Sequence, residues 1–246
     1  MAALWRSVRH ASRFVIIGPP GGGKGTICNR LVDDFGMVVV GTGDLIRQEI
    51  AAKTERGKQV EALVQSGKLV PDKVVLDLLR AKMQTLCSKP LILDGYPRTR
   101  SQAEALHEIA PPEAVLHIDV PFDAIVQRLS ERLYHPPSGR IYNLSFNPPK
   151  VDGLDDETGD PLQRRPDDEP ETVKDRLETY SRETEPVLDF YREKHIVQRF
   201  AGSETNIIYP KVKAFMSSAL PPEYAFPDTT TASPTTASVH TEQTSL

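Results

Sequence analysis

The sequence predicts an α/β fold in which a parallel five-stranded sheet is flanked by helices. Short apolar runs alternate with amphipathic helical patterns along most of the 246 residues, which is typical of a sheet covered on both faces. A glycine-rich loop, GPPGGGKGT at residues 18–26, follows the first apolar run and precedes a helical pattern. This is the setting that a phosphate-binding P-loop requires, so the expected fold class is that of the P-loop NTPases.

Five apolar runs have the length of strands and are bounded by turn residues or helical patterns. They are residues 14–17, 37–40, 91–93, 114–120 and 196–200. Helices are expected at residues 27–35, after Pro71, after Pro121 and over residues 170–194, where Pro186 predicts a bend.

Two segments interrupt this alternation. Residues 43–66 have a helical pattern, whereas residues 133–170 are rich in turn signals and lack a helical period. A structureless loop of that length is uncommon in a compact domain, so a small β lid is expected there. The predicted organisation is a basic segment at 1–12, a folded domain at 13–220 with inserts at about 41–71 and 133–170, and a disordered Thr/Ser/Pro-rich tail at 221–246.

The composition argues against several classes of protein. A net charge of −4 disfavours binding to nucleic acid, and apolar runs no longer than strands disfavour a membrane span. Cys28 and Cys87 are too far apart in sequence to suggest a metal motif or a disulfide framework, which favours a reduced compartment. Residues 1–13 contain three arginines and no acid, as in a mitochondrial targeting segment, with a plain terminus of a cytoplasmic protein as the alternative.

The glycine-rich loop carries the clearest chemistry. Glycines allow the backbone to aim several N–H groups at one anion, and the following helix adds its positive end. Lys24 is expected to reach the β- and γ-phosphates of a bound triphosphate. Gly25 stands where many P-loops place a magnesium-binding hydroxyl, and the hydroxyl of Thr26 comes one residue later.

Five motifs together resemble the adenylate kinase family of nucleoside monophosphate kinases. They are the loop at 18–26, GTGDLIR at 41–47, GKLVP at 67–71, DGYPRT at 94–99 with Gln102, and the segment 135–168, in the order and spacing of the family. The resemblance covers about residues 13–220. It implies reversible, Mg²⁺-dependent transfer of a γ-phosphoryl group to AMP, with no covalent enzyme intermediate.

The resemblance also implies roles for individual residues. Arginine suits such a site because its planar guanidinium group can bind two phosphate oxygens at once. The expected catalytic residues are Lys24, Arg98, Arg132, Arg165 and Arg176. The expected triphosphate contacts are Gly21, Gly22, Gly23, Lys24, Gly25, Thr26, Arg128, Arg132, Ile141, Tyr142, Glu204 and Thr205. The expected AMP contacts are Thr42, Arg47, Lys68, Leu69, Val70, Gly95, Tyr96, Pro97, Arg98, Gln102, Arg165 and Arg176.

Two metal questions follow from the same motifs. Asp94 ends an apolar run and is expected to hold Mg²⁺ through water, with Thr26 as a second candidate. Some family members hold the lid with four cysteines around zinc, but residues 133–170 contain no cysteine, so no structural zinc is expected. His135, Ser138, Asp155 and Thr158 stand at the corresponding places and are expected to form a hydrogen-bonded network instead.

The segment FAGSETN at residues 200–206, followed by Tyr209 and Pro210, stands where the family resemblance implies the pocket for the donor base. This segment resembles the mitochondrial branch of the family that transfers phosphoryl groups from GTP to AMP. The expected substrates are therefore GTP or ITP with AMP, the expected products from GTP are GDP and ADP, and a monomer in the mitochondrial matrix is expected. An ATP-preferring enzyme and a nucleotide-sensing module with little catalysis remain as alternatives.

Overall fold

The computed structural model describes residues 12–83, 86 and 89–225. Five parallel strands form its central sheet in the order β2-β3-β1-β4-β7. The strands are β1 (Arg13–Ile17), β2 (Val38–Gly41), β3 (Leu91–Asp94), β4 (Ala114–Asp119) and β7 (Val197–Ala201). Every apolar run expected to form a strand does so, and the predicted α/β fold is confirmed. Cys87 and most of the predicted N-terminal segment and C-terminal tail lie outside the described residues.

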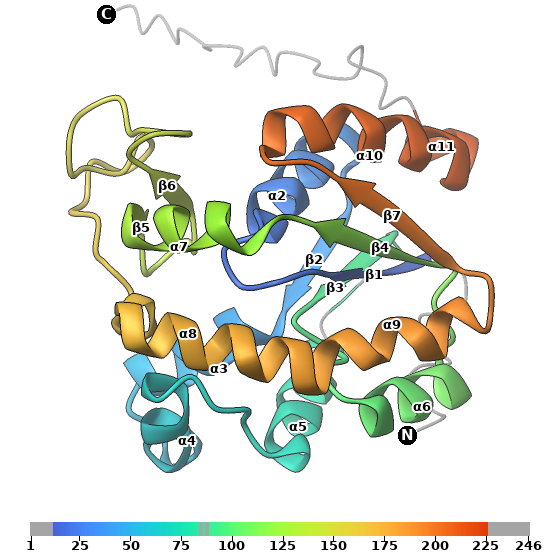
Figure 1. Ribbon diagram of the computed structural model, residues 1–246, viewed down its shortest axis with the longest axis horizontal. Coiled ribbons are helices and arrows are strands. Elements are labelled where there is room, and N and C mark those ends of the chain that lie inside the picture. The colour runs from blue at the N-terminus through green and yellow to red at the C-terminus, as the bar shows by residue number, and fades with distance from the viewer. Residues whose placement is uncertain (1–11, 84–85, 87–88, 226–246) are drawn as a thin grey trace, which may run out of the picture.

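Helices cover both faces of this sheet (Figure 1). They are α2 (Lys24–Phe35), α3 (Thr42–Ala51), α4 (Glu55–Gln65), α5 (Asp72–Met83), α6 (Arg100–Ile109), α7 (Phe122–Ser130), α8 (Pro170–Thr179), α9 (Glu185–Arg192), α10 (Thr205–Ala219) and the short α11 (Pro222–Ala225). None of the helices in the described part of the chain is long and apolar enough to cross a bilayer.

The hydrophobic core has two halves, because alternate residues of a strand point to opposite faces. In β1, Val15 and Ile17 pack with α5 and α9, whereas Phe14 and Ile16 pack with α2, α7 and α10. All four side chains are almost fully buried. Burial on both faces explains why the strands are continuous apolar runs rather than alternating ones.

Two insertions extend from the sheet (Figure 1). Helices α3 and α4 follow β2 directly. After α7, β5 (Arg132–Tyr134) and β6 (Ile141–Asn143) form a two-stranded antiparallel sheet, which an isolated bridge between Tyr134 and Gln163 extends. We call residues 132–165 the β5–β6 segment. A short 3₁₀ helix, η1 (Pro166–Asp168), connects it to α8.

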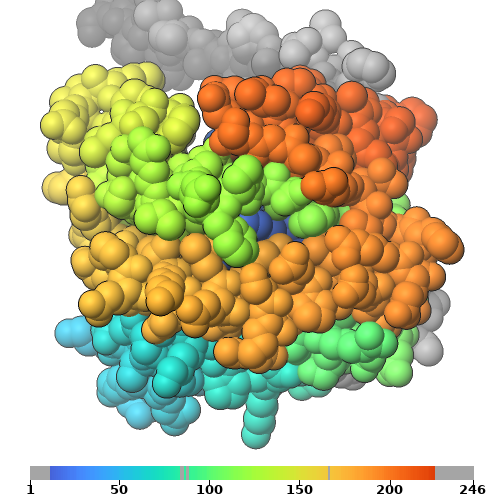
Figure 2. All heavy atoms as spheres, viewed as in Figure 1, coloured from blue at the N-terminus to red at the C-terminus, as the bar shows by residue number. Residues whose placement is uncertain are grey.

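A long, irregular helix forms one side of the molecule. Helices α8 and α9 are joined without a break by a π-helical turn, η2 (Tyr180–Thr184), and Pro186 lies at the start of α9. The irregularity that Pro186 predicts is therefore this π-helical turn, which comes just before the proline. In Figure 2 a hollow opens between α7 and this long helix, and atoms from the beginning of the described chain are visible at its base.

Candidate active site

A large pocket lies at the carboxyl ends of the strands, the usual position of a ligand site in a parallel sheet. Nineteen of the residues predicted for the site line it. They are Gly21, Gly23, Lys24, Gly25, Thr26, Arg47, Leu69, Asp94, Gly95, Pro97, Arg98, Arg128, Arg132, Ile141, Tyr142, Arg165, Arg176, Glu204 and Thr205.

An adjoining pocket contains all but one of the remaining predicted AMP contacts. It is lined by Thr42, Lys68, Val70 and Gln102, and it shares Arg47, Leu69, Gly95, Arg98 and Arg176 with the large pocket. Two predicted contacts, Gly22 and Tyr96, line neither pocket of the described chain. Gly22 is buried and its N–H donates to the Pro19 carbonyl at 3.1 Å, while the Tyr96 side chain packs in the core.

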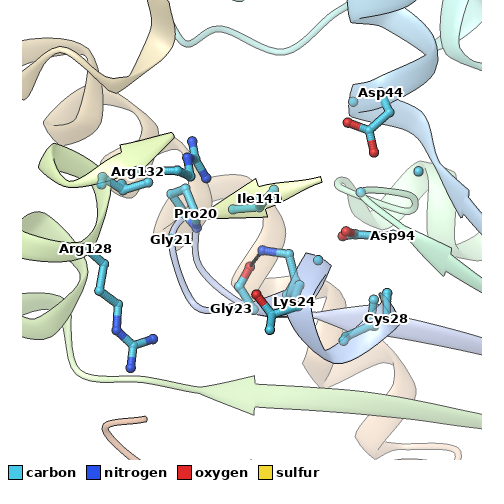
Figure 3. Close-up of a pocket in the computed structure, with 18 of the residues that line it drawn as sticks. Pro20, Gly21, Gly23, Lys24, Cys28, Asp44, Asp94, Arg128, Arg132 and Ile141 are labelled. Atoms are coloured by element: carbon cyan, nitrogen blue, oxygen red, sulfur yellow. Dashed lines mark hydrogen bonds between the residues drawn. The ribbon is translucent and has the colours of Figure 1, made fainter. Parts of the chain in front are cut away.

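The P-loop holds Lys24 at the centre of the large pocket (Figure 3). Its Nζ donates to the carbonyls of Gly18 and Pro19, at 2.7 and 2.8 Å. Burial lowers the pKa of Lys24 to about 8, and the nearby carboxylate of Asp94 limits the shift. Gly23, which precedes α2, has a φ of 85°, and a Cβ atom there would clash with Thr205 Oγ1. The loop therefore needs glycine at this position for its conformation and for the close approach of α10.

Two arginines in the pocket share one carboxylate that the sequence did not reveal. Asp168 accepts a bidentate pair from Arg132, with Nε at 2.7 Å, and a hydrogen bond from Arg176 Nη1 at 2.9 Å. Arg176 also bonds to the carbonyl and carboxylate of Asp167, at 2.7 and 3.0 Å. Both acids are buried. They fix the two guanidinium groups while leaving further N–H donors for an anion.

Arg165 is a buried cation of the pocket. Its guanidinium lies 5.2 Å from the Tyr134 ring centroid and 3.9 Å from Asp44, and its Nε has no hydrogen-bond partner within the described chain. Burial, together with the charges of Arg132 and Arg47, lowers the pKa of Arg165. A buried donor without a partner stabilises a bound anion, because the anion replaces the water that burial removed.

The residues predicted to bind AMP are organised around the end of β3. Thr42 Oγ1 and Arg98 Nε both donate to the Gly95 carbonyl, at 2.8 and 2.9 Å. Gln102 accepts from the Arg98 backbone N–H at 2.7 Å and donates to Asp72 at 2.5 Å. The amide of Gln102 is thus held in one orientation, with its remaining donor and acceptor capacity available to a base.

Two carboxylates face the same cavity, as Figure 3 shows for Asp44 and Asp94. Asp44 also pairs with Arg47 at 2.5 Å. Burial raises the pKa of Asp94, the Lys24 charge opposes this, and Asp44 adds to it. Among the described residues no cluster of three or more His, Cys, Asp or Glu could hold a metal ion alone. Any cation here must share its coordination with a ligand or water.

The pocket ends between α7 and the start of α10. Arg128 donates to the Ser203 carbonyl, and its guanidinium lies 5.2 Å from the ring centroid of Phe146. Phe146 is 43% exposed and was not among the predicted contacts. An aromatic ring that packs on a planar cation is a surface on which a flat base can stack.

The four residues predicted to form a network in the β5–β6 segment are hydrogen-bonded in two pairs, which Asp160 links through its contacts with His135 at 3.1 Å and Thr158 at 3.2 Å. His135 bonds to Ser138 at 2.8 Å, and Thr158 donates to Asp155 at 3.0 Å. Asp155 lies 3.7 Å from the His135 ring. Arg140 had not been predicted, yet it binds Asp155 through two hydrogen bonds of 2.8 and 2.5 Å and holds the pKa of that carboxyl well below its usual range.

Further contacts connect this network to the pocket. The Tyr142 hydroxyl donates to Asp155 at 2.9 Å, while Tyr142 and Ile141 also line the pocket. A Cβ atom on Gly25 would lie 3.0 Å from Ile141 Cδ1, and one on Gly139 would lie 3.9 Å from Asp44. The β5–β6 segment therefore covers the P-loop and approaches α3.

Comparison with known proteins agrees with this geometry. A family model described as adenylate kinase matches residues 16–196. A protein from Drosophila melanogaster named "GTP:AMP phosphotransferase, mitochondrial" is 43% identical over 205 residues, which are 83% of this chain and 95% of that protein. The chain therefore belongs to the adenylate kinase family of nucleoside monophosphate kinases.

Proposed function

We propose that this protein transfers the γ-phosphoryl group of GTP or ITP to AMP, reversibly and with Mg²⁺, giving GDP or IDP and ADP. The main support is the arrangement of the two pockets, because Arg47, Arg98 and Arg176 line both of them. Cations at the junction of two nucleotide sites are what a reaction between two polyphosphates needs.

In this proposal each cation has a place along the transferred group. The P-loop and Lys24 hold the β- and γ-phosphates, while Arg47 and Arg98 hold the AMP phosphate. Arg132, Arg165 and Arg176 stabilise the charge that spreads over the phosphoryl group in transit. Because Asp168 fixes Arg132 and Arg176 beforehand, little reorganisation is required at the moment of transfer.

The residues fit a magnesium ion that arrives with the triphosphate. Mg²⁺ keeps several waters and is commonly held by one or two carboxylates together with phosphate oxygens. Asp94 and Asp44 provide such carboxylates on one side of the cavity, and Thr26 lines it as well. The bound ion would supply charge neutralisation for the transferring phosphates.

We infer that the chain comprises a core, an AMP-binding insert at about 41–71 and a lid at about 133–170. The lid role is supported by the contact of Ile141 with the P-loop and by the approach of Gly139 to Asp44. Exclusion of water by this cover would direct the phosphoryl group to AMP rather than to hydrolysis.

Two observations support GTP as the donor. The Drosophila relative is named for that activity, and residues 204–206, which belong to the segment that resembles the GTP-using branch, line the large pocket together with Arg128 and Phe146. The test is to measure initial rates with AMP and a panel of GTP, ITP and ATP. We expect higher specificity constants for GTP and ITP than for ATP. A preference for ATP would make the protein an ordinary adenylate kinase, and nucleotide binding without turnover would make it a sensor.

We further propose that the protein works as a monomer in the mitochondrial matrix, without a nucleic acid or membrane partner. The Drosophila relative is named mitochondrial, and residues 1–12 have the basic pattern described above. Import of the full chain into isolated mitochondria, followed by subfractionation, tests the location. Light scattering coupled to size exclusion tests the oligomeric state.

A further inference from the structure

Helices α2 and α10 are joined by a hydrogen bond at the rim of the large pocket. Arg30 Nη2 donates to Asn206 Oδ1 at 2.6 Å, between residues 176 positions apart in sequence. Both side chains line the pocket, and Asn206 lies beside Glu204 and Thr205. The bond therefore connects the helix that begins at the P-loop with the segment proposed to meet the donor base.

Arg30 is itself held in place by α10. Its guanidinium lies 5.3 Å from the ring centroid of Tyr209, and the buried Tyr209 hydroxyl lies 2.8 Å from the Arg30 carbonyl and 2.5 Å from Asp34. Lys213 pairs with Asp34 at 2.9 Å. These contacts fix the position from which Arg30 donates to Asn206.

The chemistry of arginine then determines how the Asn206 amide points. A guanidinium has donors and no acceptor, so only the amide oxygen of Asn206 can face Arg30. The amide nitrogen of Asn206 therefore points away from Arg30, because the oxygen and nitrogen lie on opposite sides of the planar amide group. Asn206 is left with N–H donors to offer a ligand, and its oxygen is engaged.

We propose that Asn206 selects the donor base by donating its amide N–H to O6 of guanine or hypoxanthine, and that Arg30 is the positioning residue that fixes this orientation. Adenine carries an amino group where these bases carry O6, so two donors would face each other. The inference rests on the proposed preference for GTP, which it explains in terms of one hydrogen-bond donor.

The decisive variant is Asn206→Asp, which retains an acceptor for Arg30 but replaces the amide donor with a second acceptor. We expect the ratio of kcat/KM for GTP to that for ATP to fall about tenfold or more, mainly through the KM values, with ITP following GTP. Asn29→Asp is the matched control, because Asn29 lines the same pocket and gains the same charge. That control should affect GTP and ATP alike and leave their ratio unchanged.

A second pair of variants tests the positioning role of Arg30. Arg30→Lys should preserve the GTP:ATP ratio of kcat/KM, because a lysine side chain, like arginine, has only hydrogen-bond donors. Glutamine can accept a hydrogen bond as well as donate one, so Arg30→Gln allows the Asn206 amide group to rotate by about 180°. This variant should therefore bring the GTP:ATP ratio of kcat/KM close to one. Thermal unfolding of each variant establishes that the compared proteins are folded.

The outcomes separate this inference from the proposed function. If the wild-type protein prefers ATP, the GTP assignment and the inference both fail. If the wild-type protein prefers GTP and ITP but Asn206→Asp keeps the wild-type ratio, the GTP assignment stands and the inference is wrong. Equal changes of the ratio in Asn206→Asp and Asn29→Asp would also refute it, because charge alone would then account for the effect.

Discussion

The pKa of Lys24 makes the proposed donor site sensitive to mildly alkaline pH. With a pKa of about 8, roughly nine-tenths of the free protein carries the Lys24 charge one pH unit below that value and roughly one-tenth one unit above it. Loss of this proton removes a cation that the triphosphate needs. We therefore expect kcat/KM for the triphosphate to fall about tenfold from about pH 7 to about pH 9.

The same reasoning predicts a different profile for kcat. Bound phosphates stabilise the protonated amine and raise its pKa, so kcat at saturating substrates should stay nearly constant over this range. The second ionisation of a phosphate lies near pH 6, outside the range. The assay is a pH series of initial rates at saturating AMP, recorded with ATP as well as GTP because guanine itself loses a proton at more alkaline pH.

Lys24→Arg provides the matched control for the pH series. A guanidinium stays charged throughout this range, so any residual activity of the variant should lose the break near pH 8. A wild-type kcat/KM that stays flat from about pH 7 to about pH 9 would refute the reasoning. So would a profile in which the arginine variant keeps the same break.

Three other predictions address the proposed acceptor site and the proposed lid. Arg98→Ala should raise KM for AMP by about ten- to a hundredfold, and KM for the triphosphate far less, because a charge-assisted bond to the monophosphate is lost; equal weakening in two-substrate kinetics would contradict the assignment. Asp155→Ala should reduce hydrogen-exchange protection across residues 132–165 more than Asp152→Ala does, because Asp155 is buried within the hydrogen-bonded network whereas Asp152 is exposed on the same segment; equal effects of the two variants would show that Asp155 does not hold the network together. The purified protein should hold no stoichiometric zinc and should keep its activity in excess Mg²⁺ with a zinc chelator, since residues 133–170 contain no cysteine; elemental analysis and the activity assay check this.

The sequence was sufficient for the sheet and most of the pocket lining, for identifiable reasons. Buried parallel strands are short apolar runs, and the P-loop and Asp94 stand at the ends of such runs, so local pattern and position coincide. Asp168, Arg140 and Arg30 were not predicted. Each acts through a partner distant in sequence, such as Asp168 with Arg132 and Arg30 with Asn206, and spacing along one chain does not show which distant side chains will meet.

Tyr96 illustrates a different limit. It lies within the DGYPRT motif, but its side chain is 2% exposed and packs in the core, while neighbouring Gly95 and Pro97 line the pocket. A motif marks a stretch of backbone that must follow one path. It does not specify which side chains of that stretch face the pocket and which pack in the core beneath it.

The π-helical turn at η2 allows the long helix to carry an extra residue without losing its alignment. A turn with i→i+5 hydrogen bonds holds about one residue more than an α-helical turn, so the residues after η2 keep the phase of a regular α-helix that is one residue shorter. If the same residues formed a regular α-helix, every residue after η2 would rotate by about 100° around the axis. Val187, Leu188 and Tyr191, now fully buried, would then leave the core, while Arg176 upstream would stay in the pocket. The wide turn thus keeps the pocket-lining half and the core-packing half of one helix in phase, so this segment should tolerate the loss of one residue better than the gain of one.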